Sequence, residues 1–170
     1  MRTMKWIHAG LCAAVLMSGG AALAEQAPSG DQGFLAQALA TNRIELQLGR
    51  LAIEHAATPE VQAMGQKMIQ KHTELGQQLN ALALQSGATA TAETATEKET
   101  VASLVALPGG EFDTVFKKTI DDIHRRELTL YESEAKSATH PELRMLADRR
   151  VTALRKNLVD RQPAKQQKDW

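Results

Sequence analysis

Apolar residues recur at steps of three and four through four long stretches of this chain, and this pattern limits most strongly what the chain can fold into. Such steps place side chains on one face of an α-helix. The stretches run from Asp31 to about Ala57, from Pro59 to about Ser86, from about Glu111 to the breaker at Thr139, and from Pro141 to about residue 162. The sequence therefore predicts an all-α fold built on four long helices.

Two short breakers group these helices into pairs. The segments "ATPEV" at Thr58 and "THPEL" at Thr139 each place a possible capping threonine shortly before a proline that suits the first helical turn. Such tight connections predict two antiparallel helix hairpins. The linker 87–110 between them combines an Ala/Thr-rich stretch without a core pattern and the short apolar piece "VASLVAL". At about 3.3 Å per extended residue it can run the length of a helix. We predict a four-helix bundle with ferritin-like topology over residues 33–162, with one long crossover.

The first 24 residues have the layout of a secretory signal peptide. Arg2 and Lys5 precede the apolar run "GLCAAVLM", and "ALA" comes directly before Glu25. We expect cleavage near Ala24/Glu25, a short N-terminal tail over 25–32, a loose C-terminal tail over 163–170, and a periplasmic or secreted location. Leu11 before Cys12 is a poor match to a lipoprotein cleavage site.

Removal of the leader has two chemical consequences. Cys12 is the only cysteine, so the mature chain has no disulfide, thiolate ligand or cysteine nucleophile. The mature chain also keeps 18 basic and 20 acidic residues. Such a nearly neutral balance argues against nucleic acid as a partner. No apolar run of spanning length remains, so no integral membrane segment is expected after cleavage.

Three polar residues interrupt the predicted apolar faces at mid-height. His72 falls on the face formed by Met68 and Leu75, His124 lies thirteen residues after the start of its helix, and Glu45 is near the middle of the first helix. Burying these groups without partners would cost several kcal/mol. We therefore expect Glu45, His72 and His124 to meet one another, a water molecule or a metal ion.

This cluster has two interpretations, a hydrogen-bonded structural layer or a metal site. Further candidate ligands are Asp121 and Glu127, three residues before and after His124. A dinuclear carboxylate site would require Glu-x-x-His on two helices. Ile69 and Asp121 occupy the two positions where those glutamates would be. The last helix offers Arg150 and Asn157 rather than a carboxylate. The sequence therefore supports at most one mononuclear or degenerate site, and the structural interpretation is somewhat favoured.

Other candidate motifs point to no further chemistry. Met64 and Met68 are most simply core residues, because two methionines four apart are a weak copper signal. No Ser–His–Asp order, phosphate-binding glycine loop or nucleotide fingerprint is visible. An enzyme is therefore not indicated.

Three segments together resemble a known family. They are "NRIELQLGRLAIEHAATPEVQAMGQKMIQKHTEL", "PGGEFDTVFKKTIDDIHRREL" and "HPELRMLADRRVTALRKNL". They look like the secreted bacterial proteins grouped as domain of unknown function 4142, which are often labelled outer-membrane proteins. The resemblance covers about residues 33–160 and implies a ferritin-like bundle without an established activity. This chain departs from the family pattern at Lys71 and Ile123, where Asp usually precedes each histidine, and at Val151–Thr152 and Asn157, where the family usually has Leu-Pro and a later His.

Two functions remain open from the sequence. The first is a soluble, non-catalytic envelope protein that binds an unidentified envelope protein or small ligand or contributes to stress tolerance, without a cofactor. The second is a metal-binding or redox protein that holds a divalent ion at Glu45, His72 and His124, with Asp121 or Glu127 as additional ligands.

Overall fold

The computed structural model describes residues 30–160, which form five helices and no strand. In chain order these are α1 (Gly30–His55), α2 (Pro59–Ser86), α3 (Ala95–Val105), α4 (Gly109–Ser137) and α5 (Pro141–Asp160). The predicted all-α fold is confirmed, with α1, α2, α4 and α5 as its four long helices. The predicted signal peptide and the C-terminal tail lie outside the described residues. Within residues 30–160, no helix is long and apolar enough to cross a membrane.

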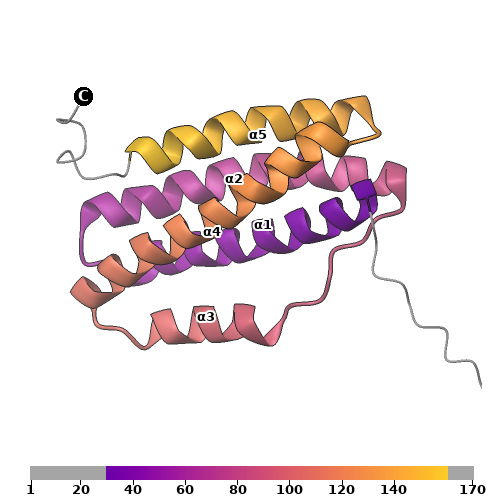
Figure 1. The fold of residues 1–170 in the computed structure, drawn as a ribbon. Coiled ribbons are helices and arrows are strands. Elements are labelled where there is room, and N and C mark those ends of the chain that lie inside the picture. The colour runs from indigo at the N-terminus through magenta and orange to yellow at the C-terminus, as the bar shows by residue number, and fades with distance from the viewer. Residues whose placement is uncertain (1–29, 161–170) are drawn as a thin grey trace, which may run out of the picture.

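The long helices form two hairpins joined by a crossover. Figure 1 shows α1 and α2 running in opposite directions, as do α4 and α5, whereas α2 and α4 run in the same direction. The chain must therefore return along the bundle between α2 and α4. It does so through α3, which lies against α1 and α4. The long crossover predicted from the length of the linker is thus present.

The linker 87–110 is more ordered than its sequence pattern predicted, because it contains α3. Thr94 and Glu97 form a capping box at the start of this helix, each side chain bonding the backbone N–H of the other. Leu104 from α3 is fully buried in the core. Arg43 of α1 donates to the carbonyl of Thr91 at 2.9 Å, which fastens the crossover to the bundle.

Both predicted breakers are fixed by carboxylates from other helices. Asp113 of α4 accepts hydrogen bonds from the backbone N–H groups of Ala57 and Thr58, each at 3.0 Å, and from the Thr58 hydroxyl at 2.6 Å. Because Asp113 takes the Ala57 N–H, α1 ends at His55, two residues before the predicted end. Thr58 caps α2 by accepting from the N–H of Val61 at 3.4 Å.

The core is divided into two apolar clusters by a layer of polar residues at mid-height. One cluster includes Leu35, Leu79, Tyr131, Leu143 and Leu154, and the other includes Leu48, Val61, Phe112, Phe116 and Ile120. Between them along the helices lie the buried polar residues Asn42, Glu45, His72, His124 and Glu127. The packing of the apolar faces therefore holds polar side chains from several helices in one layer.

Close contact between α1 and α2 is made possible by two glycines. A Cβ atom at Gly65 would lie 2.6 Å from the carbonyl oxygen of Gly49 and 2.7 Å from the Cβ of Ala52. The two backbones thus approach without an intervening side chain. One to two helical turns away from these glycines, the polar side chains of α1 and α2 therefore lie within hydrogen-bonding distance of each other.

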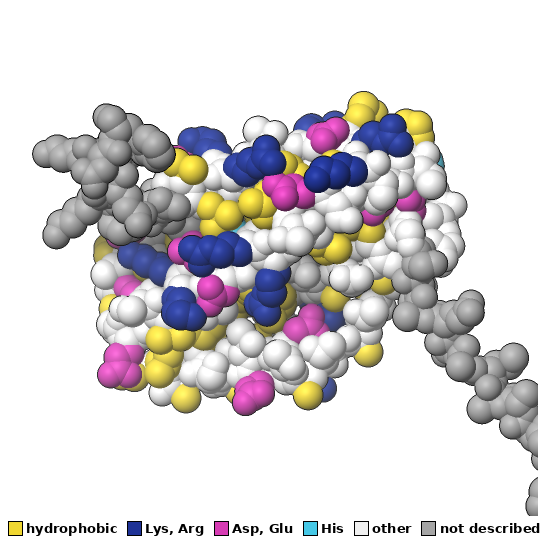
Figure 2. All heavy atoms as spheres, viewed as in Figure 1, with side chains coloured by type: hydrophobic (Ala, Val, Ile, Leu, Met, Phe, Trp, Pro, Cys, Tyr) yellow, Lys and Arg dark blue, Asp and Glu magenta, His cyan; other side chains and the backbone are white. Residues whose placement is uncertain are grey.

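The visible surface carries charges of both signs. Figure 2 shows Lys and Arg side chains interspersed with Asp and Glu side chains across this face, without an extended region of one sign. This mixture matches the nearly neutral composition of the chain.

At the end of the bundle where α4 turns into α5, two carboxyl groups interact. Asp31 accepts hydrogen bonds from the N–H and hydroxyl of Thr139 at 3.0 and 2.8 Å, and from the N–H of His140 at 3.0 Å. Glu134 lies beside Asp31 and is 5% exposed. Burial, and then the charge of Asp31 and a hydrogen bond with it, raises the pKa of Glu134 to about 7.

This pair predicts a pH-dependent stability. A carboxyl group whose pKa is higher in the folded than in the unfolded chain binds its proton more tightly when folded, so its contribution to stability falls as the pH rises from about 5 to 8. Glu134→Gln keeps a donor toward Asp31 and removes the titration. We expect the variant to melt several degrees above the wild type at pH 8 and to lose less stability between pH 5.5 and 8, measured by thermal unfolding followed by circular dichroism. Parallel pH profiles of the two proteins would contradict the prediction.

Candidate metal centre

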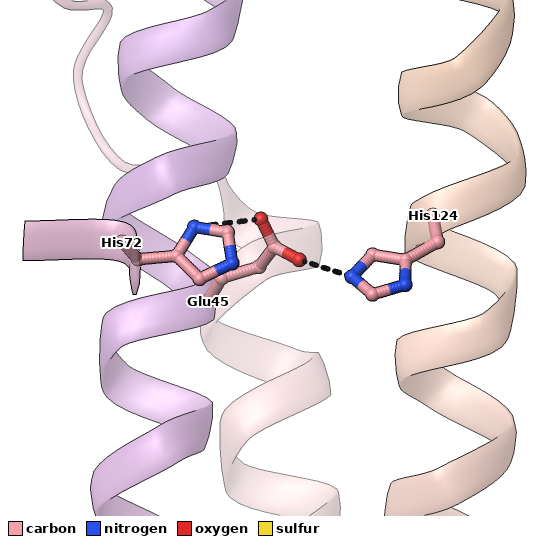
Figure 3. Close-up of side chains that lie close together, drawn as sticks. All are labelled: Glu45, His72 and His124. Carbon is pink, nitrogen blue, oxygen red and sulfur yellow. Dashed lines mark ion pairs between the residues drawn. The ribbon is translucent and has the colours of Figure 1, made fainter. Parts of the chain in front are cut away.

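Glu45, His72 and His124 meet in the centre of the bundle, each from a different helix. All three are buried, with exposed fractions of 0%, 3% and 4%. Figure 3 shows the Glu45 carboxylate between the two imidazole rings. Its Oε1 lies 3.0 Å from Nε2 of His124, and its Oε2 lies 3.2 Å from Nδ1 of His72. The structure therefore brings together the three residues that the sequence placed at mid-height.

Asn42 fixes the orientation of the His72 ring. Its Oδ1 lies 3.0 Å from Nδ1 of His72. Since Asn42 Oδ1 and the Glu45 carboxylate are both acceptors, Nδ1 of His72 carries the proton and Nε2 keeps its lone pair. Gly76 leaves room for this arrangement, because a Cβ there would lie 2.7 Å from Nδ2 of Asn42. A histidine held in this way by oxygen acceptors is typical of metal ligands.

Arg150 of α5 supplies the cation of the cluster. Its Nη2 donates to Glu127 Oε2 at 2.6 Å and lies 3.5 Å from Glu45 Oε2, and its side chain is 9% exposed. This role of Arg150 was not predicted from the sequence, where Arg150 counted only as a residue of the last helix that is not a carboxylate. A signal was present, since Arg150 lies three residues after Ala147 and four before Leu154, on the apolar face of α5.

The burial of these groups sets their protonation. Burial, and then the nearby charges of Arg150, His124 and Lys71, lowers the pKa of His72 to about 2, so its ring is neutral. Burial and the neighbouring Glu45 charge raise the pKa of Glu127 to about 7, although Arg150 opposes the shift. Burial alone would lower the pKa of Arg150, but Glu127 and Glu45 outweigh it and keep the guanidinium charged.

The other predicted ligands occupy different places. Glu127 is 2% exposed and reaches the cluster through Arg150. Asp121 is partly buried, one turn before His124, and is not among the three residues whose donor atoms converge. Asn157 lies on the wall of a cleft of about 340 Å³ that also reaches His72 and His124. The residue at the position of the family's usual later histidine is therefore close to the cluster.

The three donor atoms are nearly close enough for one ion. One ligand atom from each residue can be chosen so that all lie within 4.8 Å of one another. Tetrahedral sites with ligand distances of 2.0–2.1 Å separate their ligand atoms by about 3.4 Å. The donor atoms would therefore have to move closer together to hold one ion. Two imidazoles and a carboxylate suit Zn, Cu, Fe or Ni ions.

The chain belongs to the family described as domain of unknown function (DUF4142), whose model matches residues 16–162. No curated protein matches the chain significantly in sequence.

Several solved structures share its helical fold. CopM in the Cu(I)-bound form is 15% identical with a TM-score of 0.67, and the match covers 78% of this chain and 93% of CopM. A DUF305 fragment from Deinococcus radiodurans is 18% identical with a TM-score of 0.68, over 78% of this chain and 94% of the fragment. A DUF305 protein from Streptomyces coelicolor is 10% identical with a TM-score of 0.65, over 75% and 86%.

Proposed function

We propose that this member of the DUF4142 family is a non-catalytic metal-binding protein of the cell envelope that holds one transition-metal ion at Glu45, His72 and His124. The convergence of these three donors from three helices carries the proposal. The envelope location rests on the predicted signal peptide. Support also comes from CopM, of similar fold, whose structures include Cu(I)-, Cu(II)- and Ag-bound forms.

The surroundings of the three donors suit binding more than catalysis. Neutral His72 offers a lone pair without first losing a proton. Glu127 already pairs with Arg150, so the guanidinium keeps a partner at 2.6 Å when Glu45 turns toward an ion. The donors and Arg150 are all largely buried.

A second candidate is a purely structural polar layer in a protein that binds another envelope component. The observation in its favour is Arg150, which contacts both Glu45 and Glu127 and so balances their charge without any ion. In this case the layer fixes the register of the helices, and the function lies on the surface of the protein.

Replacing His72 with leucine separates the two candidates. Untagged wild-type protein should contain metal by mass spectrometry, and added Zn²⁺, Cu²⁺, Mn²⁺ or Fe²⁺ should raise its unfolding free energy by RT ln(1 + [L]/Kd), about 2.7 kcal/mol at one hundred times Kd. His72→Leu should abolish this gain. The variant should also lose about 1–3 kcal/mol of stability without metal, because Glu45 loses a partner.

The matched control is His140→Leu, since His140 is exposed in the turn before α5. This variant should keep the metal-dependent gain. If no metal stabilises the wild type while His72→Leu is still destabilised, the structural layer is correct. If His140→Leu loses the gain as well, the bound ion is not at Glu45, His72 and His124.

A further inference from the structure

The cleft over the metal centre is lined by a row of sulfur and nitrogen donors from one helix. Met64, Met68 and His72 occupy successive turns of α2, four residues and about 6 Å of helix rise apart. Burial increases along the row, because Met64 is partly buried, Met68 is 7% exposed and His72 is 3% exposed. The row therefore leads from the more open part of the cleft to the centre of the bundle.

His72 can serve this cleft with the nitrogen that its core contacts do not use. Its contacts with Asn42 and Glu45 both involve Nδ1. Nε2 therefore keeps its lone pair. Side chains four residues apart on a helix lie about 5–6 Å apart at their Cβ atoms, so Met68 Sδ and His72 Nε2 can chelate one ion.

The charges of the cleft favour an ion of low charge. Its walls carry the cationic groups of Lys67, Lys71 and Arg150. Two carboxylates also line it, but Glu60 pairs with Lys117 at 3.3 Å and Asp160 pairs with Lys156 at 2.9 Å. Repulsion between the walls and an entering cation grows with the charge of that cation. The cleft is therefore less unfavourable for a monovalent ion than for a divalent one.

We propose that the ion taken up through this cleft is a soft monovalent cation of the Cu(I) and Ag(I) class, bound by Met68 and His72 with Met64 as the outer donor. The thioether sulfur of methionine is a soft ligand that suits Cu(I), whereas Mn²⁺ and Mg²⁺ prefer oxygen ligands. The inference rests on the proposed metal-binding function and deepens it, because it names the class of ion and two ligands beyond the core cluster. It also gives the methionines of α2 a role besides filling the core.

Silver titration of protein labelled with ¹³C in the methionine methyl groups tests the proposal directly. The chain has six methionines, of which Met1, Met4 and Met17 lie in the predicted signal peptide. Met145 on α5 is 53% exposed and lies outside the cleft, so it reports non-specific silver binding. We expect silver nitrate in chloride-free buffer to shift the methyl signals of Met68 and Met64 at one equivalent and to leave Met145 unchanged. Zn²⁺ should leave all three unchanged.

Paired variants measure the contribution of the thioethers. Met64→Leu/Met68→Leu should weaken Ag(I) binding at least tenfold in competition titrations, whereas Met145→Leu should bind as the wild type does. Unchanged silver affinity in the double variant, or equal shifts of Met145 and Met68, would overturn the inference. The proposed metal-binding function has its own test. It is wrong if neither divalent ions nor silver give a stabilisation that depends on His72. Stabilisation by divalent ions, together with no shift of the Met64 and Met68 signals on addition of silver, would leave that function standing and refute the soft-ion cleft.

Discussion

Arg150→Met should lower the unfolding free energy by about 3–5 kcal/mol, because it leaves two buried carboxylates without their cation. Glu45 is fully buried and Glu127 is 2% exposed, and the Arg150 guanidinium lies 3.5 and 2.6 Å from them. Methionine fills much of the same volume without the charge, so the loss reports electrostatics rather than a cavity. Urea unfolding at pH 7 measures the change.

The control is Arg155→Met on the same helix. Arg155 pairs with Glu132 at 2.7 Å, but these side chains are 63% and 34% exposed. Such surface pairs contribute less than about 1 kcal/mol. Adding Glu127→Gln to Arg150→Met should restore part of the loss, since it removes one unpaired charge. Equal effects of the two arginine replacements would show that Arg150 does not balance the core.

Gly65→Ala should destabilise the protein by about 2 kcal/mol, and Gly65→Val by more. The new Cβ would lie 2.6 Å from the carbonyl oxygen of Gly49 and 2.7 Å from the Cβ of Ala52. These atoms belong to the backbone and to the first side-chain carbon of α1, so they can move only if the helices separate. Overpacking typically costs 1–3 kcal/mol, and here it outweighs the gain of up to about 1 kcal/mol from replacing glycine in a helix.

Gly110→Ala is the matched glycine control. A Cβ at Gly110 would meet nothing within 4 Å. This variant should be neutral or slightly stabilising in the same urea titration. Metal affinity adds a second measurement, because separation of α1 from α2 would also move Glu45 away from His72. A Gly65→Ala protein as stable as Gly110→Ala would contradict the close contact of the two helices.

The helices themselves were largely predictable, because their signals are local. The three- and four-residue period and the Thr and Pro breakers depend only on neighbours along the chain, and α2 begins and ends at Pro59 and Ser86 as predicted. The short helix α3 was missed because its one buried apolar residue, Leu104, gives no periodic face. Its order comes from the capping box at Thr94 and from the bonds of Arg43, which join residues far apart in sequence.

The sequence by itself determined the all-α class, the two hairpins and the height of Glu45, His72 and His124 along the bundle. The height of a residue along the bundle follows from its position in its helix, at 1.5 Å per residue. A residue in the middle of a helix stays at mid-height whichever way the helix runs. Only the tertiary structure decided which side chains meet at that height. Arg150 and Asn42 contact the cluster, and Asp113 and Asp31 accept hydrogen bonds from the backbone N–H groups of the two turns. These contacts form because each helix has a particular rotation and distance relative to its neighbours. The rotations and distances of the helices come from the packing of whole apolar faces, including the glycine contact between α1 and α2. They cannot be predicted from any local pattern in the sequence.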